Sequence, residues 1–173
     1  MILIPKYQNV IEVGGSLSII VTDGLTNQIK QEVYVPNLIV TLGKAFIASR
    51  MVGTAQATMS HMGIGTDSSV NADAAIEVAK TALGAELTVS PGGYTGYARA
   101  ALTPTPSATN NVVTYATTFN AQNPSAPSGG AVLREAGIFN AATGGTMLCR
   151  TTFPIVTKLP ADALAISWTI TIS

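Results

Sequence analysis

The stretch ALAISWTITIS (163–173) alternates apolar side chains with small or polar ones at every position. One face would carry Leu164, Ile166, Trp168, Ile170 and Ile172, and the other Ala165, Ser167, Thr169 and Thr171. Because successive side chains of a strand point to opposite faces of a sheet, this pattern predicts a strand with one buried face. We therefore expect Trp168 to lie in the core.

A second alternating stretch, REAGIFNAATGGTMLCRTTF (134–153), turns at Gly144 and Gly145, which predicts a β-hairpin with AATGG as its loop. In all, six strand-like runs separated by Pro, Gly, Asn and Ser cover residues 87–90, 94–103, 111–119, 131–140, 146–156 and 163–173. Short strands without intervening helices predict a mainly β protein, an antiparallel β-sandwich.

The first part of the chain is expected to be extended. Residues 16–23 and 28–35 alternate on either side of a turn, so we expect an N-terminal arm or β-ribbon over 1–35 and a sandwich domain over 36–173. Two short helices are expected near 41–52 and 72–83. The first would bury Leu42, Ala45, Phe46, Ser49 and Val52 and end at a Gly53 cap, and the second would follow an Asn71 cap and bury Ile76, Ala79 and Leu83.

Two segments rich in Pro, Ser and Asn, residues 103–110 and 120–130, carry no charge and lie between predicted strands. They are expected to be loops at one end of the sandwich, either flexible tips or surfaces that become ordered against a neighbour.

Charge is scarce in this chain. Only 10% of its 173 residues are charged, and nine basic and nine acidic side chains give a net charge of zero. Without excess charge there is no long-range attraction to nucleic acid or to an anionic membrane, and no apolar run reaches the roughly 20 residues that span a bilayer. A neutral, charge-poor surface suits burial against neighbours, which points to a subunit of an assembly.

Few residues could support catalysis or bind a metal. Cys149 is the only cysteine and lies in an alternating run, so it is expected to be a small core residue. His61 is the only histidine, and a triad of Ser60, His61 and Asp67 has no supporting motif. The glycines of GIGTD (63–67) are expected to allow close packing rather than dinucleotide binding. We expect no catalytic residue, no cofactor and no metal.

Two constellations have alternative interpretations. Asp67, Ser68, Asn71 and Asp73 could supply oxygen ligands to calcium, although their spacing lacks the central Gly and terminal Glu of an EF-hand, and helix capping by Asn71 is the simpler account. Arg134 and Glu135 point to opposite faces of one strand, so Arg150 on the next strand is a candidate partner for Glu135. The alternative is an edge strand protected by its charges.

Four segments, in order along the chain, resemble a group of small virion proteins of tailed bacteriophages. They are PNLIVTLGKAFIASRM (36–51), SHMGIGTDSSVNADAAI with LGAEL (60–87), NVVTYATTF (111–119) and the stretch from REAGIFN to the final residue (134–173). The resemblance implies a structural protein of the particle, either a head decoration or cement protein or a tail-fibre or baseplate component. It brings no catalytic residues.

For a cement protein, we expect binding across boundaries between shell subunits in the expanded lattice, which stabilises the head by mass action. The expected partners are the major capsid protein or another virion structural protein and further copies of this chain, with a trimer implied by the resemblance. The expected location is the virion, assembled in the host cytoplasm. Residues 1–35 are expected to contact the shell or a neighbouring copy by strand addition.

Three alternatives stay open. A tail-fibre or baseplate adaptor would present loops 103–110 and 120–130 to the host surface, but these loops contain no aromatic residue. A small cell-wall hydrolase would need an acid-base centre built from residues such as His61, Glu86 or Glu135. A glycan-binding module would need Tyr94, Tyr97 or Trp168 to be exposed.

Overall fold

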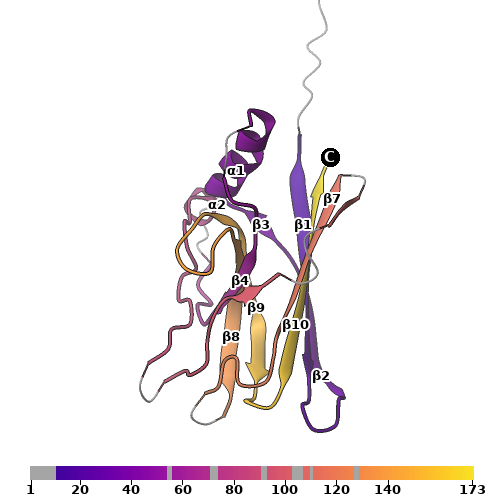
Figure 1. Ribbon diagram of the computed structural model, residues 1–173, viewed down its shortest axis with the longest axis vertical. Helices are drawn as coiled ribbons and strands as arrows, with labels where there is room; N and C mark the ends of the chain where they lie inside the picture. The colour runs from indigo at the N-terminus through magenta and orange to yellow at the C-terminus, as the bar shows by residue number, and fades with distance from the viewer. Residues whose placement is uncertain are drawn as a thin grey trace, which may run out of the picture.

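The computed structural model shows two antiparallel five-stranded sheets packed face to face (Figure 1). It describes residues 11–53, 56–70, 74–90, 93–102, 107–109, 111–126 and 129–173. Sheet A has the strand order β2-β1-β10-β7-β6 and sheet B the order β3-β9-β8-β4-β5. The elements are β1 (Val13–Thr22), β2 (Ile29–Pro36), β3 (Leu38–Ile39), α1 (Thr41–Met51), β4 (His61–Gly65), α2 (Ala74–Val78), β5 (Ala100–Ala101), β6 (Ser107–Thr109), β7 (Val112–Phe119), β8 (Ala131–Phe139), β9 (Met147–Lys158) and β10 (Ala163–Ile172). The predicted mainly β sandwich with two short helices is confirmed.

The core lies between the two sheets. Sheet A contributes the alternate residues of β1 and β10, among them Leu17, Ile19 and the fully buried Trp168, and sheet B contributes Met62 and Ile138. The core position predicted for Trp168 is confirmed. Neither described helix is long and apolar enough to cross a membrane.

The two strands expected as an N-terminal ribbon are built into sheet A. β1 pairs with β10 over its whole length, from Val13 opposite Ile172 to Thr22 opposite Ala163, and β2 pairs with the other edge of β1. The expected segment 1–35 is thus, from residue 11 onward, part of the sandwich. Residues 1–10 lie outside the described part of the chain.

Helix α1 forms where the sequence predicts it, and Gly53 follows it with a left-handed φ of +69°. The predicted buried face is wrong, because Leu42 is 38% and Val52 78% exposed. The helix instead packs on β9 through Gly43 and Phe46. A Cβ on Gly43 would lie 1.9 Å from the carbonyl oxygen of Leu148, so only glycine permits this close contact.

Helix α2 is shorter than predicted, with five residues, and its face also differs. Ile76 and Ala79 are exposed, Leu83 is buried as predicted but lies beyond the helix, and Glu77 is the buried residue of the helix itself. The reason is an ion pair from Glu77 to Arg150, which turns this side chain towards the sheet. The predicted Asn71 cap lies outside the described residues.

The strand predictions hold for β1 and β2 and again from β7 to β10, and they fail between these two groups. Residues 87–90 and most of the described residues 94–102 form isolated bridges and loops, with only Ala100–Ala101 as a strand. β3, β4 and β6 were not predicted. β6 occupies 107–109 inside the expected loop 103–110 and pairs beside the start of β7, whereas the segment 120–130 follows its end. The described residues of the two segments therefore lie at opposite ends of β7.

Candidate functional site: a buried charge network and a charge-poor sheet face

The outer face of sheet B is covered by the chain between β4 and β5, and three glycines allow the close approach. A Cβ on Gly65 would lie 2.5 Å from the carbonyl oxygen of Ala85, and one on Gly63 would lie 3.0 Å from Glu86 Oε1. On β8, a Cβ on Gly137 would lie 2.9 Å from Leu83 Cδ2. The expectation that the glycines of GIGTD serve close packing is confirmed.

Arg150 lies in this interface and binds three carboxylates. Its Nε donates to Glu135 Oε2 at 2.9 Å, Nη1 to Glu77 Oε2 at 2.8 Å and Nη2 to Asp67 Oδ2 at 3.0 Å. The Arg150 side chain is 3% exposed. One guanidinium therefore joins β8, β9, helix α2 and the segment after β4. The predicted pair of Arg150 and Glu135 is confirmed, whereas the contributions of Asp67 and Glu77 were not predicted.

Glu135 also holds the covering segment by its backbone. The N–H groups of Gly84 and Ala85 donate to its two carboxylate oxygens at 2.9 and 2.7 Å. The Ser69 hydroxyl and then its backbone N–H donate to Asp67 Oδ1 and, with Arg150 nearby, hold the pKa of Asp67 below its usual value. Hydrogen bonds from backbone and side-chain donors thus fix the positions of both carboxylates.

A second ion pair lies beside the first. Arg99 binds both oxygens of Glu86, at 2.7 and 2.8 Å, and its guanidinium stacks over the Phe139 ring at 3.4 Å from the centroid. It also donates to the carbonyl oxygens of Ala141 and Gly144, in the hairpin loop between β8 and β9. Arg99 therefore joins the covering segment to the predicted AATGG loop, where Gly144 and Gly145 adopt positive φ.

Tyr97 also binds Glu86, the carboxylate of this second ion pair. Its hydroxyl donates to Glu86 Oε1 at 2.9 Å and accepts the N–H of Ile64 at 3.3 Å. Burial raises the pKa of the Tyr97 phenol, so it stays protonated and keeps donating. Because Glu86, Glu135 and Asp67 all accept bonds from fixed partners, the arrangement anchors the covering segment to sheet B.

The structure does not assemble the triad considered from sequence. Ser60 Oγ lies 2.8 Å from His61 Nδ1, but both bonded oxygens of Asp67 face Ser69 and Arg150 instead. In the calcium alternative, Asn71 and Asp73 lie outside the described residues and Ser68 is exposed. Among the residues that the structure places, no three His, Cys, Asp or Glu side chains gather as metal ligands.

The remaining candidates occupy the core or its margin. Cys149 is fully buried, as predicted, and burial raises the pKa of its thiol. Tyr94 and Tyr97 are half-buried. Arg134 lies on the opposite side of β8 from Glu135 and forms no ion pair within the described ranges.

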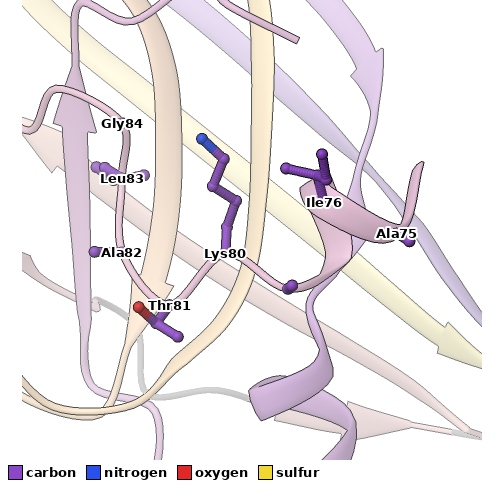
Figure 2. Close-up of a pocket in the computed structure, with 8 residues that line it drawn as sticks. Ala75, Ile76, Lys80, Thr81, Ala82, Leu83 and Gly84 are labelled. Atoms are coloured by element: carbon purple, nitrogen blue, oxygen red, sulfur yellow. The ribbon is translucent and has the colours of Figure 1, made fainter. Parts of the chain in front are cut away.

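A shallow groove of about 680 Å³ lies between helix α2 and residues 81–84. In Figure 2 the Lys80 side chain rises between Ile76 and the backbone of Ala82 and Leu83. Lys80 is the only charged residue in its described lining, and its charge also favours the ionised form of Asp67. The groove is thus an open surface above the Arg150 network.

The outer face of sheet A differs from that of sheet B, because β1, β10 and β7 carry only uncharged and mostly small side chains there. The outward residues are Ser16, Ser18, Ile20 and Thr22 of β1, Ala163, Ala165, Ser167, Thr169 and Thr171 of β10, and Val112, Thr114, Ala116 and Thr118 of β7. A shallow depression of about 160 Å³ lies at its centre, around Ser18, Ala116 and Ser167.

Burial of charge makes the surface poorer in charge than the composition indicates. Glu77, Glu135, Arg150, Lys158 and Asp162 are all buried, in a chain with nine basic and nine acidic residues. On the outer face of sheet A the strands β1, β10 and β7 carry no charge, and Glu32 of the edge strand β2, opposite Ile20, lies at the margin of that face.

Comparison of the chain with protein-family models, with curated proteins and with solved structures found no match.

Proposed function

We propose that this protein is a structural subunit of a tailed-phage virion, a capsid cement or decoration protein that binds between shell subunits. The observation that carries the proposal is the outer face of sheet A, where three adjacent strands present uncharged and mostly small side chains. Such a face loses little on desolvation because it buries no charge, so it suits packing against another protein.

The motifs that resemble phage virion proteins support a structural role. SHMGIGTD and REAGIFN lie side by side as β4 and β8, with Gly63 opposite Gly137 and Gly65 opposite Glu135. The carboxylates of Asp67 and Glu135 in these motifs both bind Arg150, and Glu135 also binds the backbone of the covering segment. We infer that these motifs maintain the fold on one side, while the other side contacts the neighbour.

In the proposed role, the partner is the major capsid protein or another virion structural protein, and the protein acts in the assembled particle. Binding only to the expanded lattice would stabilise that lattice by the free energy of binding at each site. Many such sites, repeated by the symmetry of the shell, would add their contributions.

The test is binding of recombinant protein to particles that lack it, with immunogold labelling of the particles by electron microscopy. We expect label over the head. Ser167→Lys places a charge at the centre of the sheet A face and should reduce labelling at least tenfold, whereas Ala142→Lys in the exposed hairpin loop should leave it unchanged. Label confined to the tail would favour a tail-fibre or baseplate adaptor, and an unlabelled particle would refute the proposal.

A further inference from the structure

Strand β2 forms a free edge of sheet A whose backbone groups can be assigned. Asn37 N–H donates to Gly15 O at 3.2 Å, so the residue after β2 still bonds towards β1. Because bonding direction alternates along an antiparallel strand, Val33 and Val35 also bond towards β1. The N–H and C=O groups of Glu32 and Tyr34 therefore point away from the sheet.

This edge is the longest one that the described residues leave open. The other outermost strands, β3, β5 and β6, have two, two and three residues, whereas β2 has eight. The nearby edge of β9 is occupied by the Gln31 side chain, whose Oε1 accepts the N–H of Thr157 at 2.8 Å. Strand addition to this protein is therefore most favourable at β2.

We propose that β2 pairs antiparallel with β2 of a second copy, with the two-fold axis at Val33. In this register Glu32 faces the partner's Tyr34, and both residues exchange backbone hydrogen bonds across the axis. The exposed Tyr34 phenol, 72% exposed in the single chain, then lies beside the partner's Glu32 carboxylate and can donate to it. An axis at Glu32 would instead place two carboxylates opposite each other, which disfavours that register.

The residues that commonly block edge pairing do not block this register. Lys30 is already neutralised, because its Nζ donates to the buried carboxylate of Asp162 at 2.9 Å. Pro36 has no N–H, but it would lie at the end of the pairing, opposite the partner's Lys30, where a β-bulge already interrupts the regular ladder of β2. The edge of β2 can therefore pair with the same edge of a second copy.

The pairing would join the two copies of sheet A into one continuous sheet. This inference rests on the proposed role as a subunit of an assembly. It specifies the strand through which two copies make contact. A two-fold contact also differs from the trimer that the sequence resemblance implies, so measured molar mass distinguishes them.

The test is a cysteine substitution on the proposed axis. In Val33→Cys the two thiols would face each other at a Cα separation of about 4.5 Å, within the range for a disulfide. Oxidation of the full chain at micromolar concentration should convert most of it to a covalent dimer. In the matched variant Glu32→Cys the two Cα atoms would lie about 8 to 9 Å apart, too far for a disulfide, and we expect at least tenfold less dimer.

The wild-type protein is the background control, because its one cysteine, Cys149, is buried. Tyr34→Pro provides a second test that needs no disulfide. It removes an N–H that points away from β1, so the fold should persist, and we expect sedimentation velocity to show self-association weakened at least tenfold. Circular dichroism checks the fold of each variant.

Three results would overturn the pairing: no dimer of Val33→Cys above the wild-type background, equal dimer from Glu32→Cys, or unchanged association of Tyr34→Pro. If Val33→Cys does not fold, the Tyr34→Pro measurement decides. Particle labelling without a disulfide dimer would refute only this interface. A disulfide dimer that leaves particles unlabelled would instead refute only the proposed virion role.

Discussion

Gly65 of β4 lies directly opposite Glu135 of β8, and a Cβ on Gly65 would lie 2.5 Å both from Glu135 Oε1 and from the carbonyl oxygen of Ala85. The glycine thus leaves the space in which the carboxylate and the covering backbone meet. A side chain there would have to displace backbone, not only the end of a flexible side chain.

We predict that Gly65→Ala lowers the free energy of unfolding by about 1–3 kcal/mol, the usual effect of overpacking. The matched control is Gly14→Ala, at an exposed strand position where a Cβ would meet nothing within 4 Å. That change should alter stability by less than about 0.5 kcal/mol. Urea denaturation measures both, and equal effects would contradict the close packing.

Arg150→Met should destabilise the protein by about 3–5 kcal/mol, because it removes the buried cation that binds Glu135, Glu77 and Asp67. Arg134→Met, the control on the neighbouring strand, should cost less than about 1 kcal/mol. Urea denaturation gives the two values. Hydrogen exchange should also show faster exchange at the Gly84 and Ala85 amides in Arg150→Met, and unchanged protection there would argue against the anchoring role.

The Asp67 and Ser69 contact predicts a pH dependence. A carboxyl whose pKa is lower in the folded state stabilises the fold above its unfolded pKa, near 3.8, and this contribution disappears as the pH falls through the lowered folded pKa. Ser69→Ala should therefore cost about 0.5 kcal/mol at pH 7, because the bond is solvent-exposed, and progressively less as the pH falls below 3.8. Ser68→Ala, the exposed neighbour, should show no such difference.

Lys158 is fully buried, and its Nζ has no hydrogen-bond partner in the described structure. Burial lowers the pKa of Lys158, only partly opposed by the charge of Asp162. The folded state then binds fewer protons than the unfolded state between that lowered value and 10.5, so this group's contribution to stability rises with pH across that window.

We predict that Lys158→Met stabilises the protein by about 1–3 kcal/mol at pH 7, and that this gain shrinks as the pH approaches 10. Lys44→Met, at an exposed position of helix α1, should have little effect. Thermal denaturation at several pH values measures both. Destabilisation by Lys158→Met at neutral pH would show that the amine has a favourable partner.

The sequence predicts those strands in which the alternating apolar residues are also the ones buried in the core. Alternation identified β1, β2 and β7 to β10, and the charges of Arg134 and Glu135 inside an apolar strand pointed to Arg150 as a partner of Glu135. β4 was missed because two of its five residues are glycine, which weakens the β signal while serving the packing of the covering segment.

The failures share one physical origin, which is contact with residues distant in sequence. Glu77 is buried through Arg150, 73 positions further along, so helical periodicity around it is misleading. Residues 87–90 and 94–103 have strand-like composition, yet Arg99 and Tyr97 are directed to Glu86 on the surface of sheet B. No window of local sequence contains these partners.

The pairing of β1 with β10 has a consequence for synthesis. These strands are separated by roughly 150 residues, so at 5–20 residues per second the ribosome needs on the order of 10–30 s between making one and the other. During this interval β1 cannot pair with β10. The apolar side chains of Leu17, Ile19 and Val21, which are buried in the complete fold, then stay exposed. The chain should thus complete its fold only once β10 has left the ribosome, which makes nascent copies the form most prone to aggregate or to bind chaperones.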